Sequence, residues 1–114
     1  MNKTQKGARG EALALRYLIH KGYHLVAQNV RMNRKEIDIV MRDGACTVFI
    51  EVKARSSNLF GSPAEAVDRR KQAALIVAAS LYMQKYHIGA ARFDVVEIDL
   101  QRGDVRHIQN AFMA

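Results

Sequence analysis

The sequence contains a single cysteine, Cys46, among its 114 residues. One cysteine excludes an internal disulfide and a zinc site built from several thiolates. No apolar run approaches the ~20 residues that a membrane-spanning helix needs, and the first residues lead into no apolar signal segment. We therefore expect a cytoplasmic protein without a membrane partner.

Aromatic residues are few and scattered. They make up 7% of the chain and are not interleaved with basic residues, which argues against a stacking platform for single-stranded nucleic acid. The four histidines show no spacing typical of metal ligands, so each is expected to be an ordinary surface or strand-end residue. No repeat, low-complexity tract or linker divides the chain, and residues 1–114 are predicted to form one domain.

Basic residues outnumber acidic ones, 18 to 11, which gives a formal net charge of +7. This excess favours an anionic partner such as nucleic acid, although a basic surface without any ligand is the plain alternative.

Apolar periodicity and turn signals predict the order helix, three strands, helix, two strands. The first helix is expected from about Thr4 to Lys21, with Gly22 placed to end it. Its inward stripe is predicted to be Ala8, Ala12, Leu15, Leu18 and Ile19. Residues 62–65 match a capping box that would begin a second helix ending near Tyr86. The strands are expected at about 24–31, 36–40, 48–53 and 91–100, with a short last one ending near residue 110.

The second and third strands carry charged side chains where a small protein would normally place core residues. If Asp43-Gly44 is a two-residue turn, Asp38 faces Phe49 and Glu36 faces Glu51. Because side chains alternate along a strand, the even positions 36–40 share a face with the odd positions 49–53. A three-residue loop would place Asp38 on the opposite face. The two-residue turn therefore predicts that Asp38, Glu51 and Lys53 converge.

Carboxylates gathered in this way repel one another unless a cation lies between them. Glu11 falls on the predicted inward stripe of the first helix and would also need a partner if buried. A cation at the hairpin would account for Glu11, Asp38 and Glu51 together. Carboxylate oxygens favour Mg²⁺ or Mn²⁺, and Lys53 could then orient a water molecule and neutralise charge on a phosphate.

Several other charged residues allow two interpretations. Glu36 is either an outer ligand or base behind the metal ligands, or it pairs with Arg34 or Lys35. Lys71 either snorkels to the surface or points at the hairpin acids. Arg55 suits a phosphate or a surface salt bridge. Arg92 and Asp94 share a strand face, and an internal ion pair is the favoured interpretation.

The spacing from Asp38 to Glu51-Val52-Lys53 is similar to the Asp, Glu-x-Lys signature of restriction-endonuclease-like nucleases. A longer pattern over nearly the whole chain resembles the small bacterial YraN family, also called UPF0102, which is similar in turn to archaeal Holliday junction resolvases. That pattern comprises Gly10-Glu11-Ala12, Gly22-Tyr23, Asn29, Glu36-Ile37-Asp38, Phe49-Ile50-Glu51-Val52-Lys53-Ala54-Arg55, Phe60-Gly61, Ala66-Val67, Lys71 and Arg92-Phe93-Asp94.

The resemblance implies an α/β fold of the restriction-endonuclease type, with a mixed, mostly antiparallel sheet flanked by helices. It implies that Glu11, Asp38, Glu51 and the carbonyl of Val52 are metal ligands and that Lys53 is catalytic. Candidate nucleic-acid contacts are Arg34, Lys35, Arg55 and Lys71.

Two residues depart from the pattern: Ile37 replaces a motif proline, and Lys35 stands where the family usually has glycine. Neither change removes a catalytic residue.

The leading hypothesis is thus a Mg²⁺-dependent nuclease acting on DNA, with branched DNA and a homodimer suggested by the resolvase resemblance alone. The rival hypotheses are a non-catalytic nucleic-acid-binding protein and a basic module that docks an acidic protein.

Overall fold

The computed structural model describes residues 3–56, 61 and 68–113. Their order is α1 (Lys3–Lys21), β1 (His24–Met32), β2 (Lys35–Asp43), β3 (Cys46–Arg55), α2 (Arg69–Tyr86), β4 (Ala91–Asp99) and β5 (Val105–Phe112). The predicted order of helices and strands is therefore confirmed. Neither helix within the described ranges is long and apolar enough to cross a membrane.

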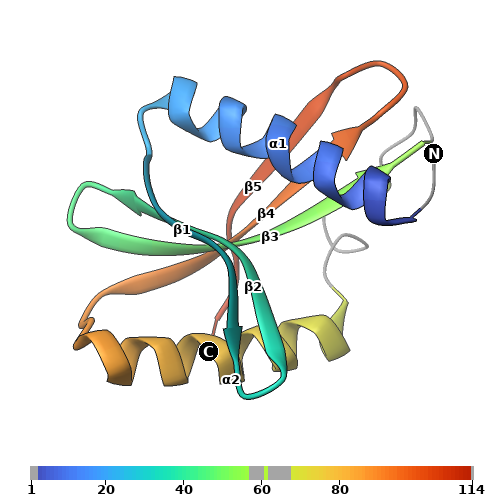
Figure 1. Ribbon diagram of the computed structural model, residues 1–114. Helices are drawn as coiled ribbons and strands as arrows, with labels where there is room; N and C mark the ends of the chain where they lie inside the picture. Colours follow the sequence, from blue (N-terminus) through green and yellow to red (C-terminus); the bar gives the residue numbers. More distant parts are fainter. Residues whose placement is uncertain (1–2, 57–60, 62–67, 114) are drawn as a thin grey trace.

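The five strands form one mixed sheet in the order β1-β2-β3-β4-β5. Only β3 and β4 run parallel, and the other neighbours are antiparallel. α1 covers one face of the sheet and α2 covers the other (Figure 1). Each helix buries its own core against the sheet, one around Ala14 and Leu18 of α1 and one around Leu75 and Tyr82 of α2. The predicted mixed sheet flanked by helices is thus confirmed.

The inward face of α1 differs from the predicted stripe. Gly10, Ala14 and Leu18 are buried, whereas Ala8 and Ala12 are exposed. Ile19 is 50% exposed. A Cβ atom at Gly10 would lie 2.5 Å from the Cβ of Ala54, so the missing side chain lets α1 approach β3. This close approach at a glycine determines which side of the helix faces the sheet. Apolar periodicity cannot predict it, because glycine does not count as an apolar residue in the pattern. Gly22, with φ of 107°, ends α1 as predicted.

An aspartate side chain caps the N-terminus of α2. Asp68 is its N-cap, in an extended conformation, and its carboxylate accepts hydrogen bonds from the backbone amides of Arg70 and Lys71. This is ordinary N-capping by an aspartate. The predicted capping box at residues 62–65 lies outside the described residues. Leu75, Ala78, Ala79 and Tyr82 are the buried residues of α2.

The β2–β3 turn is Gly44-Ala45 and not Asp43-Gly44. Asp43 pairs with Cys46, and Val40 pairs with Phe49. The prediction that Asp38 faces Phe49 and Glu36 faces Glu51 is therefore wrong. The register differs by two residues, which leaves the faces unchanged, because side chains alternate with a period of two. Val40 and Phe49 accordingly lie in the same core cluster, beside α2.

β2 separates from β3 before it reaches the β1–β2 turn. Its last pair with β3 is Ile39 with Ile50, whereas it stays paired with β1 as far as Lys35. Asn29 of β1 has a left-handed φ of 50° at this point. Ile37 and Val40, three residues apart, both pack beside α2, so β2 exchanges faces between them. The separation leaves Asp38 at a gap between β2 and β3.

Candidate functional site

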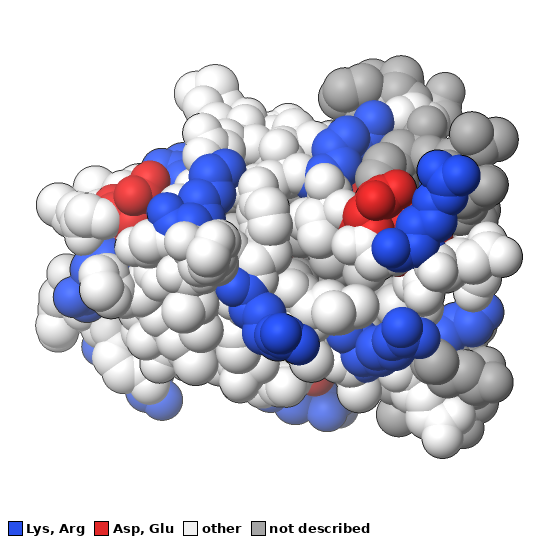
Figure 2. Space-filling view, turned by 90° about the horizontal axis from the view of Figure 1, so that it is seen from above, with Lys and Arg blue, Asp and Glu red and all other residues white. Residues whose placement is uncertain are grey.

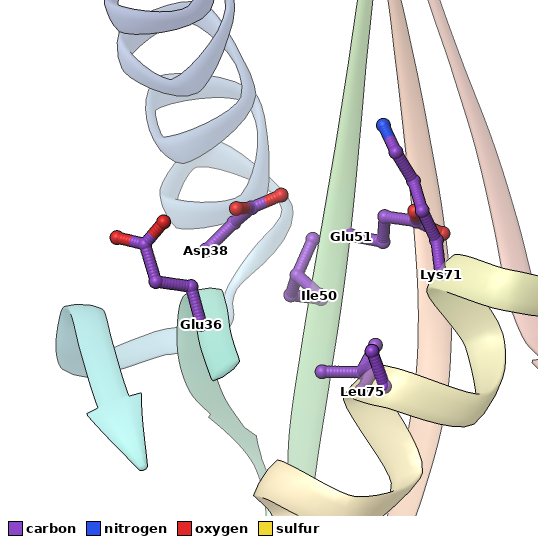
Figure 3. A pocket seen from close by; sticks show the side chains of 7 residues that line it. Glu36, Asp38, Ile50, Glu51, Lys71 and Leu75 are labelled. Atoms are coloured by element: carbon purple, nitrogen blue, oxygen red, sulfur yellow. The ribbon is translucent and has the colours of Figure 1, made fainter. Parts of the chain in front are cut away.

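A cavity of about 180 Å³ lies where β2 separates from β3, with α2 as its other wall. Glu36 and Asp38 approach it from β2, Glu51 from β3, and Lys71 from the first turn of α2 (Figure 3). Its apolar wall consists of Ile50, Ala74 and Leu75. The structure thus brings two of the predicted metal ligands, Asp38 and Glu51, to one cavity.

Asp38 is fixed by the backbone of the neighbouring strand. Its Oδ2 accepts a hydrogen bond of 2.9 Å from the amide of Val52. Burial raises the pKa of Asp38, and the negative charge of Glu36 adds to this. The Val52 hydrogen bond and the positive charge of Lys71 act in the opposite direction but leave the pKa above its ordinary value.

Glu51 is 7% exposed, and its Oε2 is buried without a hydrogen-bond partner among the described residues. Burial raises the pKa of Glu51, while the positive charges of Lys53 and Lys71 lower it and Asp38 raises it further. A buried carboxylate oxygen without a partner is costly, because neither water nor a donor solvates its charge. Glu51 is therefore poised to accept a cation or a proton.

Glu11 approaches the same region from α1. It lines a groove of about 690 Å³ between α1 and β1, together with Gln28 and Asn29, and does not line the cavity beside α2. Burial, together with the negative charges of Asp38 and Glu36, raises the pKa of Glu11 to about 7. Its Oε1 is buried without a hydrogen-bond partner in the described part of the chain.

Asp38 is the acid that connects the two sides. Its charge raises the pKa of Glu11 and also that of Glu51. However, within residues 3–56, 61 and 68–113, no three His, Cys, Asp or Glu side chains are gathered so that they could hold one metal ion. The three predicted acidic ligands are close enough to affect one another's pKa, but they do not form a complete coordination sphere.

The chemistry of these groups fits a divalent cation. Two of the three carboxylates carry a buried oxygen that receives no hydrogen bond from the described residues, and the pKa of each of the three is raised. The backbone of Val52 adds a further oxygen. Its amide points towards β2, and in a strand the carbonyl of a residue points to the same side as its amide. Carboxylate and carbonyl oxygens are the ligands that Mg²⁺ and Mn²⁺ prefer.

The predicted basic residues occupy different surroundings. Lys71 lines the cavity and is also exposed, so the structure combines its two open interpretations: the side chain borders the hairpin acids, whose pKa values its charge lowers, and still reaches the surface. Lys53 acts on Glu51 electrostatically and does not line the cavity. Arg55 lies 3.3 Å from the fully buried Glu97, so the salt-bridge interpretation is the one observed.

Arg34 and Lys35 lie at the β1–β2 turn. Within the described residues neither forms an ion pair with Glu36, which lines the cavity instead.

The Arg92–Asp94 ion pair is confirmed, with Nε and Oδ1 3.1 Å apart. The histidine prediction is wrong for His107, whose side chain is 2% exposed and whose Nε2 lies 2.7 Å from Asp94 Oδ2. The sequence analysis also missed Glu97, which is fully buried between Arg55 and Arg106. The available signal was an acid in the middle of the apolar strand 91–100.

The chain is similar to proteins of one family over nearly its whole length. A family model described as "Uncharacterised protein family UPF0102" matches residues 10–98, which include Glu11, Asp38, Glu51 and Lys71. A UPF0102 protein of Clostridioides difficile (strain 630) is 40% identical, with 98% of this chain and 100% of the relative covered. A UPF0102 protein of Pseudomonas savastanoi pv. phaseolicola (strain 1448A / Race 6) is 41% identical, over 97% and 95% of the two chains. One of Symbiobacterium thermophilum is 43% identical, over 95% and 96%.

Proposed function

Since the chain belongs to the uncharacterised protein family UPF0102, whose name states no activity, we propose its function from the site: a metal-dependent nuclease that hydrolyses phosphodiester bonds of DNA. The observation that carries this proposal is the pair of buried carboxylate oxygens, one on Glu11 and one on Glu51, that find no hydrogen-bond partner in the part of the chain that the structure describes; the charge of Asp38 acts on both residues. Such an arrangement is unfavourable on its own and becomes favourable when a cation binds.

Asp38, Glu51 and the Val52 carbonyl would hold Mg²⁺ or Mn²⁺, and Glu11, which lines the groove on the α1 side, would become a further ligand if the ion drew the three carboxylates together. The ion would supply a polarised phosphate oxygen and a more acidic water molecule. Lys71 and Lys53 are close enough to Glu51 to lower its pKa, and their charges would neutralise the negative charge that grows on the phosphate during attack. Glu36, at the mouth of the cavity, orients water that enters it.

A basic surface supports a polyanionic substrate. The chain carries a formal net charge of +7, and Lys and Arg side chains are spread over the face that bears α1, with acidic side chains in small groups (Figure 2). Positive charge of this kind attracts nucleic acid without reading its sequence. Action on branched DNA in the cytoplasm, as a homodimer, extends the proposal by analogy with resolvases.

The proposal is tested by a cleavage screen. Purified protein is incubated with linear, nicked, flapped and four-way DNA in Mg²⁺, in Mn²⁺ and in a chelator. We expect metal-dependent cleavage of at least one substrate and none by the Asp38→Asn variant, which keeps an oxygen for the Val52 amide but loses the charge. If the protein cut none of these substrates with either metal, the nuclease proposal would be rejected.

A second function is favoured by one observation, namely that the described residues contain no group of three acids placed to hold a metal. A non-catalytic DNA-binding protein could keep Asp38 and Glu51 without binding any ion. Its affinity for DNA would fall steeply with salt and would be unchanged by Mg²⁺ and by Asp38→Asn. Calorimetric titration with Mn²⁺ separates the two functions. A nuclease should bind the ion and should lose this binding in Asp38→Asn, whereas a non-catalytic DNA-binding protein should not bind the ion.

A further inference from the structure

The end of the β1–β2 hairpin, residues 30–37, extends beyond the point where β2 leaves β3. We call these residues the basic arm. β1 and β2 remain paired along it up to Met32 and Lys35, while the β2–β3 ladder has already ended at Ile39. Figure 1 shows the arm turning away from the rest of the sheet and passing across α2. The arm is therefore a two-stranded ribbon at the border of the acidic cavity.

The basic arm is anchored on one side. Ile37 is fully buried in the core cluster beside α2, and Val30 and Met32 pack against the same cluster. Its tip is a tight two-residue turn in which Asn33 and Arg34 have φ values of 50° and 70°. Positive φ at both central residues is the geometry of a turn that matches the twist of a hairpin. The arm is thus held in a fixed position relative to the cavity.

The tip and the opposite face of the basic arm are exposed. Asn33 and Arg34 are exposed at the tip, and Arg31 is exposed on the opposite face, where its cross-strand partner is Glu36; Lys35 shares the anchored face with Met32 and is partly exposed. Within the described part of the chain, none of these three cations forms an ion pair. The one acid of the arm, Glu36, lines the cavity. Cations fixed on a rigid ribbon and left without a protein partner are suited to bind the phosphates of a nucleic acid.

We propose that the basic arm binds duplex DNA, with Arg31 and Arg34 on the phosphates that border a groove. A two-stranded ribbon fits the major groove of B-form DNA, whereas the major groove of A-form RNA is too narrow for side chains and a single strand has no groove. Glu36 and Asp38 follow directly along β2, so a phosphate next to those held by the arm reaches the cavity where Lys71 stands on the other side. The orientation of the DNA towards the cavity rests on the proposed nuclease function; the binding itself does not.

The test compares two double variants that remove the same charge. Arg31→Gln with Arg34→Asn neutralises the arm, and asparagine tolerates the positive φ at position 34. Arg42→Gln with Arg102→Asn removes two exposed arginines elsewhere, one near the opposite end of β2 and one in the β4–β5 turn. Binding of a 20-base-pair DNA duplex is measured in a chelator, so that no cleavage occurs, over a range of salt concentrations.

We expect the arm variant to bind about tenfold more weakly than wild type near 0.1 M salt and to lose about 1 to 2 from the slope of log K against log salt. The Arg42/Arg102 variant should change affinity by less than about threefold, and Arg31→Lys with Arg34→Lys should restore binding. The loss should be smaller on single-stranded DNA and on an RNA duplex of equal length. Thermal unfolding of each variant checks that the fold is kept.

Three results would overturn the inference: no binding of duplex DNA by wild type, equal losses in the two double variants, or an equal loss on single strands and RNA. These results are distinct from failure of the nuclease proposal. A protein that binds duplex DNA through the arm yet cuts nothing keeps this inference and loses the nuclease. If the protein cut and bound DNA equally well with and without Arg31 and Arg34, the nuclease proposal would stand and this inference would be rejected.

Discussion

The carboxylate of Asp38 accepts a hydrogen bond from the backbone amide of Val52, 2.9 Å away, at a point where their two strands no longer pair. The backbone pairing of β2 with β3 ends at Ile39 and Ile50, and the side chain of Asp38 makes one further hydrogen bond between the two strands. Asp38 is held in the gap by this bond, with Glu11 and Glu51 on either side. The bond also shows which edge of β3 faces the gap, because the amide and carbonyl of Val52 point the same way.

Asparagine and alanine at position 38 should separate the structural role of this residue from its charge. Asp38→Asn keeps an oxygen for the Val52 amide and removes a charge that repels Glu11 and Glu51. We expect unchanged or increased stability without metal, and loss of metal binding and cleavage. Asp38→Ala leaves the Val52 amide without its partner and should destabilise the fold by about 1 to 3 kcal/mol. Urea unfolding measures both values; equal destabilisation by the two variants would contradict this division of roles.

The sequence could predict that Asp38 and Glu51 approach each other, because a two-residue turn gives β2 and β3 the right parity as far as Val40 and Phe49; the exchange of faces in β2 beyond that pair was not predictable. The predicted turn, Asp43-Gly44, lies one residue before the observed one. An Asp-Gly pair normally puts glycine at the second central position, but here Gly44, with φ of 59°, takes the first and Ala45 the second. Both turns have the same length, so the register moved by two and the faces were kept.

Other parts of the site depend on contacts that no local pattern contains. The exchange of faces in β2 occurs where the ladder to β3 ends and opposite the left-handed Asn29 of β1, and the cavity lies at the same place. His107 is buried because Asp94, on the adjacent strand, accepts its hydrogen bond. The cavity and the burial of this histidine are therefore tertiary features.

Gly10 and Gly7 in α1 make a matched pair for testing what positions Glu11. A methyl group at Gly10 would meet Ala54 at 2.5 Å, whereas one at Gly7 would meet nothing within 4 Å. We expect Gly10→Ala to destabilise the protein by about 1 to 3 kcal/mol through overpacking. Gly7→Ala should stabilise it by about 0.5 to 1 kcal/mol through lower chain entropy. Thermal or urea unfolding measures both.

The double variant Gly10→Ala with Ala54→Gly restores the space and should recover most of the lost stability. A double-variant cycle without such coupling would show that α1 is not positioned by this contact.

Metal-free protein should lose stability as pH rises, in part because of Glu11. Its pKa is about 7 in the folded chain, above the ordinary 4.5, so between these values the folded state holds a proton that the unfolded state has released. Stability therefore falls with increasing pH over this window and the loss is complete above pH 7. Glu11→Gln cannot ionise, so its melting temperature in a chelator should fall less between pH 5 and 8 than that of wild type.

Two additions sharpen the Glu11 test. Asp104→Asn, an exposed acid in the β4–β5 turn, is the matched control and should keep the wild-type pH dependence. Adding Mg²⁺ at pH 8 should raise the melting temperature of wild type more than that of Glu11→Gln, because ligand binding stabilises the folded state. If Glu11→Gln showed the same pH dependence as wild type, the buried carboxyl would not be a source of this instability.

Lys71 should act on the phosphate and not on the metal. It lines the cavity, and its positive charge lowers the pKa of both Asp38 and Glu51. Lys71→Ala removes a cation that competes with the metal for these carboxylates, so Mn²⁺ affinity should be equal or higher. The same change removes charge stabilisation of the attacked phosphate and should lower kcat by about 100-fold to 1000-fold.

Lys85→Ala, in the last turn of α2, is the control and should leave both quantities unchanged. A Lys71→Ala protein with normal kcat and weaker DNA binding would instead make Lys71 a binding contact, and weaker Mn²⁺ binding would mean that the lysine organises the acids it faces.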